Sequence, residues 1–63
     1  MKNNIKKLRR TAKLSQEELA KLCKVSRQTI NAIENDKYDP TLQLAFTIAS
    51  VLETTVDKLF INN

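Results

Sequence analysis

Residues 16–35, QEELAKLCKVSRQTINAIEN, decide the fold of this chain. They predict two short helices, because each helical stretch has its own start signal. Ser15 and Glu18 have the spacing of a capping box, in which a hydroxyl and a carboxylate satisfy backbone N–H groups at the helix start. Ser26 is the second N-cap candidate. About three residues separate the helices, which leaves room only for a tight turn.

The start of the second helix carries side chains that suit nucleic acid. Arg27 and Gln28 can form bidentate hydrogen bonds with base edges, and the hydroxyls of Ser26 and Thr29 can bond to phosphates. The competing interpretation is an ordinary polar first turn on a surface helix. The apolar residues of the segment recur at helical spacing, as expected for two helices packed on one core. They are Leu19, Ala20, Cys23, Val25, Ile30 and Ile33.

The segment resembles the phage repressor/Cro-type helix-turn-helix family, and in particular its short, stand-alone transcriptional regulators. Both caps, the small residue Ala20 and the ending at residues 33–35 match, and the similarity covers nearly the whole chain. The matching positions outside the motif are Leu8, Arg9, Tyr38, Pro40, Leu42, Ile48, Ala49, Val56 and Phe60. The resemblance implies an all-α fold of five short helices, the lambda-repressor-like DNA-binding domain. Residues 1–63 would form this single domain, with the motif at about 16–35.

Charge divides the chain into two halves. Residues 1–31 hold nine Lys and Arg against two Glu, a net charge of +7, whereas residues 32–63 hold two Lys against five acidic residues, a net charge of −3. The basic half contains the two-helix motif, as expected for a surface that meets phosphates. For the first helix alone, a solvated lysine-rich face explains the charge equally well.

Composition excludes several kinds of site. The chain has no His and one Cys, so neither an internal disulfide nor a zinc site is expected. Cys23 lies on an apolar face and is interpreted as a small core residue. Without His, and with carboxylates scattered along surface helices, we expect no enzyme, no metal and no cofactor. No apolar run approaches the ~18 residues of a membrane span, so we expect a cytoplasmic protein.

The other helices follow from the same signals, with Thr41 as the N-cap of the fourth. The expected ranges are about 4–13, 16–23, 27–35, 42–53 and 56–61. The chain contains no glycine, although turns between helices usually need a residue with positive φ. Lys13, Lys24, Asp36 and Glu53 occupy those places, and we expect strain at Lys24.

The family resemblance also implies which residues touch DNA. In the family, the second helix of the motif enters the major groove and its N-terminal residues read base edges. The matching positions are Arg27, Gln28, Asn31 and Ala32. Arg27 suits guanine, Gln28 suits adenine, and Ala32 suits a thymine methyl group. Expected phosphate contacts are Gln16, Ser26, Thr29, Lys37, Tyr38, Arg10 and Lys6.

Arg9 and Glu34 match a structural pair of the family. In similar proteins an arginine of the first helix pairs with the glutamate that closes the recognition helix, beneath the DNA face. The pair is expected to tie the first helix to the recognition helix. Its net stabilisation is small, because desolvation offsets the attraction, but removing one partner is costly.

A surplus of apolar residues near the C-terminal end predicts a homodimer. On a helical wheel of residues 42–52, one arc is expected to face the core, with Phe46 at its edge. That arc contains Leu42, Ala45, Ile48, Ala49 and Leu52. Leu44 and Val51 fall outside the arc, and Ile61 is left over after the fifth helix. We expect these three to form a two-fold interface, with scattered exposed apolar residues as the alternative.

The sequence therefore predicts a regulator of transcription that binds double-stranded DNA sequence-specifically, a repressor acting as a homodimer on a palindromic operator. A two-fold pair sets its recognition helices about 34 Å apart, one turn of DNA, which demands such an operator. The alternative is an antitoxin-like DNA-binding protein that also binds a protein partner, but only residues 62–63 follow the fifth helix. No small-molecule ligand is evident. The resemblance implies a bacterial or phage protein that is associated with the nucleoid.

Overall fold

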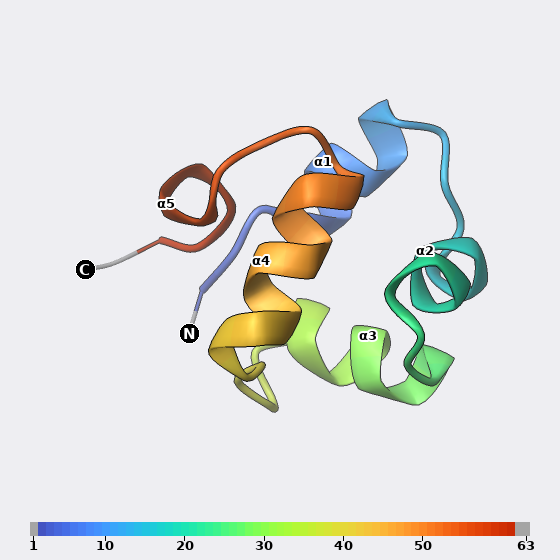
Figure 1. The fold of residues 1–63 in the computed structure, drawn as a ribbon. Coiled ribbons are helices and arrows are strands. Elements are labelled where there is room, and N and C mark those ends of the chain that lie inside the picture. Colours follow the sequence, from blue (N-terminus) through green and yellow to red (C-terminus); the bar gives the residue numbers. More distant parts are fainter. Residues whose placement is uncertain (1, 62–63) are drawn as a thin grey trace.

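The computed structural model describes residues 2–61, which form five α-helices (Figure 1). They are α1 (Ile5–Thr11), α2 (Gln16–Cys23), α3 (Arg27–Glu34), α4 (Leu42–Val51) and α5 (Val56–Leu59). The predicted all-α fold class is confirmed. Helix α2 has its predicted bounds, and the other helices end one or two residues earlier than predicted.

Side-chain caps start the three central helices. Ser15, Ser26 and Thr41 each accept a hydrogen bond from the backbone N–H three residues further on, at 3.0, 3.2 and 3.1 Å. At α2 the capping box is complete, because the Ser15 N–H also donates to the Glu18 carboxylate at 2.9 Å. These bonds satisfy N–H groups that have no partner inside the helix. They explain why helices of eight to ten residues begin where the sequence indicates.

The capping box makes stability depend on pH through Glu18. The backbone N–H of Ser15, and next its hydroxyl, hold the pKa of the Glu18 carboxyl below its usual range. A lowered pKa stabilises the fold above the unfolded pKa, and this contribution is lost as the pH falls through the folded pKa. We expect Glu18→Gln to unfold more easily than wild type at pH 7, with the gap closing at pH 3. Urea melts at both pH values measure it, and a gap of equal size at both would contradict the account.

Four non-glycine residues among those described have positive φ. They are Lys13 at 61°, Lys24 at 59°, Asp36 at 59° and Glu53 at 55°. These are the four positions predicted from the absence of glycine, so that prediction is confirmed. At the end of α2, the Val25 N–H donates to the Ala20 carbonyl at 3.0 Å, which closes the helix and reverses the chain.

Lys24→Gly is expected to stabilise the protein by up to about 1 kcal/mol, because it removes a Cβ from a left-handed residue. Lys21→Gly is the matched control, since it removes the same charge from the helical part of α2. That control is expected to cost about 1 kcal/mol. Urea melts of both variants measure the two effects. A Lys24→Gly variant that loses as much as Lys21→Gly would show that the turn is unstrained.

The buried apolar side chains form one cluster, and each of the five helices contributes at least one of them. They are Ile5, Leu19, Ala20, Cys23, Ile30, Ile33, Ala45, Ile48, Ala49, Leu52, Leu59 and Phe60. Cys23 is among them, and burial raises the pKa of its thiol. A thiol that is harder to ionise is a poor nucleophile, which agrees with a packing role.

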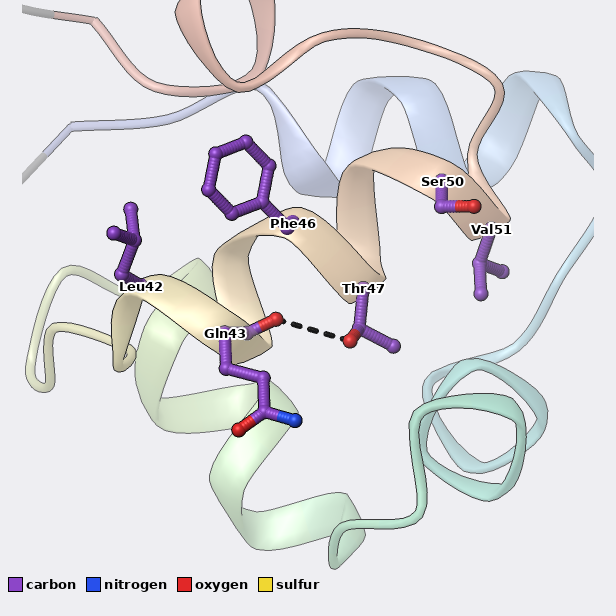
Figure 2. A pocket seen from close by; sticks show the side chains of 6 residues that line it. All are labelled: Leu42, Gln43, Phe46, Thr47, Ser50 and Val51. Atoms are coloured by element: carbon purple, nitrogen blue, oxygen red, sulfur yellow. Dashed lines mark hydrogen bonds between the residues drawn. The ribbon is translucent and has the colours of Figure 1, made fainter.

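The predicted wheel of α4 is wrong at its two edges. Leu42 was expected in the core and is 69% exposed, and Phe46 is 58% exposed (Figure 2). Leu44 and Val51 were expected on the surface, but both are half-buried against the core. For Leu44 the reason is that α2 covers one flank of α4, where Leu44 and Cys23 line the same hollow. The exposed apolar surface of α4 therefore lies on the opposite flank from the one predicted.

The two ends of the described chain lie side by side (Figure 1). Asn3 and Phe60 form an antiparallel bridge, and the Ile61 N–H donates to the Lys2 carbonyl at 2.8 Å. The Asn3 side chain donates to the carbonyl of Ile33 in α3 at 2.8 Å. This pairing was not predicted. It leaves Ile61 39% exposed beside the end of α5.

Candidate nucleic-acid interface

The first turn of α3 presents polar side chains to solvent. Arg27 and Gln28, the two leading candidates for reading bases, are both exposed. The Ser26 hydroxyl accepts the Thr29 N–H at 3.2 Å, and the two hydroxyl oxygens lie 3.0 Å apart in a further hydrogen bond. These two hydroxyls therefore shape the helix start, and each keeps only part of its bonding capacity for a phosphate.

Buried residues on the opposite side of α3 fix the position of this turn. Ile30 and Ile33 of α3 are buried in the cluster that also holds Leu19 and Ala20 of α2. The small side chain of Ala20 lets the two helices approach closely. The exposed turn is thus carried by a helix that is anchored by buried side chains, which suits a site that must present donors at fixed positions.

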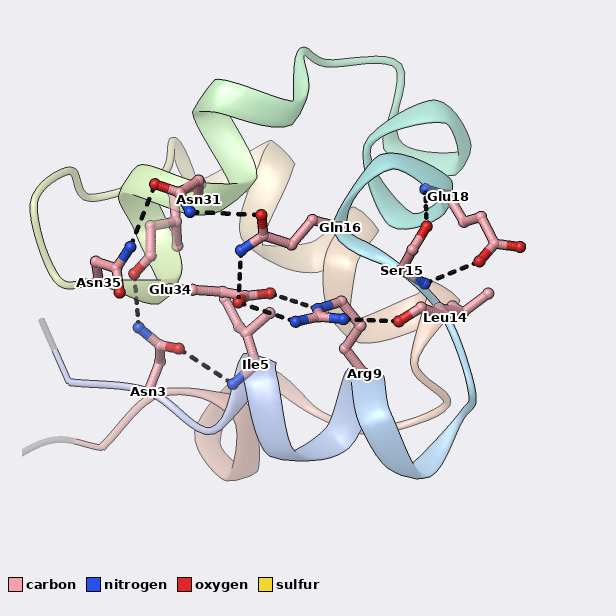
Figure 3. Close-up of polar contacts among 11 residues, drawn as sticks. Asn3, Ile5, Arg9, Leu14, Ser15, Gln16, Glu18, Asn31, Glu34 and Asn35 are labelled. Carbon is pink, nitrogen blue, oxygen red and sulfur yellow. Dashed lines mark hydrogen bonds and ion pairs between the residues drawn. The ribbon is translucent and has the colours of Figure 1, made fainter.

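An ion pair joins α1 to the last turn of α3 (Figure 3). The Arg9 Nε donates to Glu34 Oε2 at 2.7 Å, and a terminal nitrogen of the same guanidinium donates to Oε1 at 3.3 Å. Its other terminal nitrogen donates to the Leu14 carbonyl at 2.7 Å. The structure therefore places Arg9 and Glu34 as the family resemblance implied.

Amide side chains continue this network to the exposed side of α3 (Figure 3). The Gln16 amide donates to Glu34 Oε1 at 3.0 Å, and the Asn31 amide donates to the Gln16 oxygen at 3.4 Å. Asn35 in turn donates to Asn31 at 3.2 Å. Gln16, at the start of α2, is thus linked to a candidate base-reading residue of α3.

The Arg9–Glu34 ion pair is buried, so it affects both the electrostatic potential near α3 and the stability of the fold. The side chains of Arg9 and Glu34 are only 10% and 2% exposed. An unpaired carboxylate at this depth would repel an anion approaching α3, and the guanidinium cancels that charge. Every buried side-chain nitrogen and oxygen among the described residues has a hydrogen-bond partner. The network is therefore complete, which is the condition for a buried polar cluster to be tolerated.

The remaining predicted contacts differ in position and in exposure. Lys37 and Tyr38 are exposed in the loop after α3, and Ala32 is half-buried, which limits how far its methyl group reaches. Lys6 and Arg10 are exposed and line an open hollow made by the N-terminal segment and α1 alone. The structure brings these two basic side chains to the outward side of α1, whereas Arg9 points to α3.

Sequence reasoning missed several polar contacts of amide side chains, among them one within this network and one made by the N-terminal segment. The Gln16–Asn31 bond joins residues 15 positions apart, and the Asn3–Ile33 bond joins residues 30 positions apart. An amide side chain gives no sequence signal about its partner, because it can donate to or accept from many groups. Only the packing of α1, α2 and α3 selects these partners.

Sites of other kinds are not found in residues 2–61. In that part of the chain, no group of three His, Cys, Asp or Glu side chains is arranged to hold a metal ion. The described helices include none with the length and hydropathy needed to cross a membrane.

Sequence comparison gives close relatives over almost the whole chain. An uncharacterized HTH-type transcriptional regulator from Methanocaldococcus jannaschii is 52% identical over 61 residues, 97% of this chain and 92% of that protein. Similar regulators from Archaeoglobus fulgidus and Bacillus subtilis are 43% and 40% identical, over 97% and 95% of this chain and 86% and 91% of theirs. The relatives are archaeal as well as bacterial, so the resemblance does not establish a bacterial or phage origin.

Solved structures of other transcription regulators have the same fold as this chain. A hypothetical transcription factor from Neisseria superposes with a TM-score of 0.81 at 27% identity, over 87% of this chain and 62% of that one. An HTH_3 family transcriptional regulator from Vibrio cholerae superposes with a TM-score of 0.72 at 35% identity, over 82% of this chain and 29% of that one. Both known proteins are thus longer than the region that matches.

A match to a family model that covers most of the chain identifies the family. The family model HTH_3, described as helix-turn-helix, matches residues 5–59, which run from the first residue of α1 to the last residue of α5. This range contains the exposed turn of α3 and the Arg9–Glu34 pair beneath it. The chain therefore belongs to the HTH_3 family of Cro/C1-type helix-turn-helix proteins, and it is a DNA-binding transcriptional regulator, not an enzyme.

Proposed function

We propose that this protein is a sequence-specific repressor that binds a palindromic operator as a homodimer, with α3 in the major groove. The observation that carries the proposal is the first turn of α3. It exposes Arg27 and Gln28 on a helix whose other end is locked by the buried Arg9–Glu34 pair. Bound over promoter DNA, such a dimer would exclude the polymerase by occupying its site.

Base reading is divided among four side chains of α3. Arg27 donates two hydrogen bonds to the O6 and N7 atoms of a guanine, and Gln28 forms a bidentate pair with an adenine. Asn31 is held by its bonds to Gln16 and Asn35, so it would contact one defined position. The half-buried Ala32 packs against a thymine methyl group where the groove wall comes close.

Phosphate contacts surround the reading turn. Gln16 lies in the first turn of α2, where free N–H groups and the helix dipole favour an anion. The hydroxyls and cations beside it would fix the register of the protein on the duplex without reading sequence. These side chains are Ser26, Thr29, Lys37, Tyr38, Arg10 and Lys6. We further propose that residues 1–63 act as one domain, in the cytoplasm, where the chromosome lies.

DNA binding is expected to weaken steeply with salt, because each phosphate contact releases counterions. Lys37→Ala removes one such contact and is expected to reduce the slope of log K against log salt by about 0.9. Lys58→Ala is the matched control, since it removes the same charge from α5 and is expected to leave the slope unchanged.

Fluorescence anisotropy with a labelled mixed-sequence duplex, titrated at several salt concentrations, measures both slopes. Wild type that fails to bind this duplex at low salt would overturn the proposed function. Equal slopes for wild type and Lys37→Ala would remove Lys37 from the interface.

A further inference from the structure

A chain of hydrogen-bonded side chains runs from the buried ion pair to the exposed side of α3 (Figure 3). Both carboxylate oxygens of Glu34 accept hydrogen bonds from Arg9, and Oε1 also accepts from the Gln16 amide at 3.0 Å. The Gln16 oxygen accepts from the Asn31 amide at 3.4 Å, and the Asn31 oxygen accepts from the Asn35 amide at 3.2 Å. These bonds link side chains of α1, α2 and α3 in one order.

The Glu34 carboxylate sets the direction of every bond in this chain. A carboxylate paired with a guanidinium accepts hydrogen bonds and has none to donate. The Gln16 side chain must therefore turn its NH2 group to Glu34, which leaves its oxygen facing Asn31. Asn31 must then donate with its own NH2 group, and its oxygen is left to accept from Asn35. A 180° flip of the Asn31 amide would set its oxygen against the Gln16 oxygen, so one orientation is favoured.

We infer that Asn31 reads an adenine in the major groove, and that Gln16 and Asn35 are positioning residues that fix its amide for this task. The inference rests on the proposed function and names the base that this part of α3 recognises. Asn31 is exposed and lies four positions after Arg27, so both side chains project from the same side of the helix. Four residues span about 6 Å of helix axis, so the two bases are at most about two base pairs apart.

The hydrogen-bonding capacity left to Asn31 selects adenine. A side-chain amide has two N–H donors and two acceptor lone pairs. The bonds to Gln16 and Asn35 use one donor and one lone pair of Asn31, so one of each remains. The major-groove edge of adenine presents a donor at N6 and an acceptor at N7, which matches that remaining pair. Guanine presents two acceptors there, and one of them would face the Asn31 oxygen.

A phosphate contact alone does not explain the bonds of Gln16. The side chain is half-buried, and both ends of its amide are engaged within the protein. One N–H remains, which is enough for the phosphate contact proposed above. A residue that only contacts a phosphate affects all sequences equally, whereas a positioning residue changes the preference for one base. Base preference therefore separates the two roles.

Selection from a random duplex pool tests the assignment of Asn31. Wild type is expected to enrich an adenine within about two base pairs of the guanine that depends on Arg27. Asn31→Ala is expected to reduce the preference for that adenine by about 5–150-fold and to keep the guanine. A wild-type consensus without such an adenine, or an Asn31→Ala consensus identical to wild type, would overturn the inference.

Gln16→Met and Asn35→Ala test the positioning roles, because each removes one partner of the Asn31 amide and leaves the buried ion pair in place. Each is expected to reduce the preference for the same adenine by about 2–12-fold, the equivalent of one hydrogen bond. The guanine preference is expected to stay, which also shows that α3 is folded. Gln43→Met is the matched control, since it makes the same change on the exposed face of α4.

Anisotropy titrations with the selected duplex and its single-base variants measure these preferences. Gln43→Met is expected to leave all of them unchanged. A wild-type preference for the adenine in either positioning variant, or an equal loss of the guanine preference, would contradict the assigned roles.

A double variant tests whether Gln16 acts through Asn31. In an Asn31→Ala background, Gln16→Met is expected to change no base preference, because no amide remains for it to position. A further change of preference at any base would show that Gln16 reads that base itself, which would overturn its positioning role.

The same titrations separate this inference from the proposed function. Duplex binding with a guanine preference that depends on Arg27, but with no adenine preference that depends on Asn31, would refute the inference alone. Wild type that binds no duplex of the pool would refute the proposed function, and the inference with it.

Discussion

A Glu34→Ala variant is expected to lose about 3–5 kcal/mol of unfolding free energy. The substitution leaves the Arg9 guanidinium, which has a 10% exposed side chain, without its carboxylate, and it removes the acceptor of the Gln16 amide. At ~0.05–0.15 kcal/mol per residue, a domain of this size has only about 3–9 kcal/mol in total. The loss is therefore expected to take a third or more of the total stability, and circular dichroism in urea measures it.

Two further variants distinguish the loss of the buried ion pair from the loss of any glutamate. Glu17→Ala removes an exposed glutamate of α2 and is expected to change stability by only about 0.5 kcal/mol. Arg9→Met combined with Glu34→Leu removes both charges and is expected to recover part of the loss, because no buried charge then lacks a partner. A Glu34→Ala variant as stable as Glu17→Ala would show that the pair does not hold α1 to α3.

Arg27→Ala is expected to weaken binding to the best DNA site by about 1–3 kcal/mol, or about 5–150-fold. The expected cause is the loss of two hydrogen bonds to one guanine, so the preference for that base should relax as well. Arg27 is exposed, so the fold is expected to be unchanged. Anisotropy titrations with the best site and with single-base variants of it measure both effects.

Arg10→Ala is the matched control for charge, because it removes an exposed arginine from α1. It is expected to weaken binding to all sequences about equally and to leave base preference unchanged. If the two variants behave alike, Arg27 contacts the phosphate backbone instead of a base edge.

Local signals predicted most of the fold. The caps at Ser15, Ser26 and Thr41 and the four residues with positive φ depend on side chains and backbone close in sequence, and all are found in the structure. The family resemblance supplied the partner of Arg9, which lies 25 positions away. The antiparallel contact of Asn3 with Phe60 was not predicted, because a one-residue bridge leaves no alternating pattern.

The error on α4 shows what a helical wheel lacks. A wheel gives the angle between side chains but does not say which neighbouring helices cover each flank. The wheel put Phe46 at the edge of the apolar arc and Leu44 outside it, but Leu44 packs against the core beside α2 while Phe46 is exposed. The exposure of Arg27 and Gln28 was easier to predict, because both directly follow the N-cap of a short helix.

Selection of bound sequences from a random duplex pool tests the central claim, that α3 reads DNA as part of a two-fold pair. The account predicts a palindromic consensus whose half-sites lie about 10 base pairs apart, centre to centre, or a multiple of that. The same selection with Arg27→Ala should lose one guanine preference in each half-site. An unenriched pool, or an identical consensus for wild type and Arg27→Ala, would contradict it.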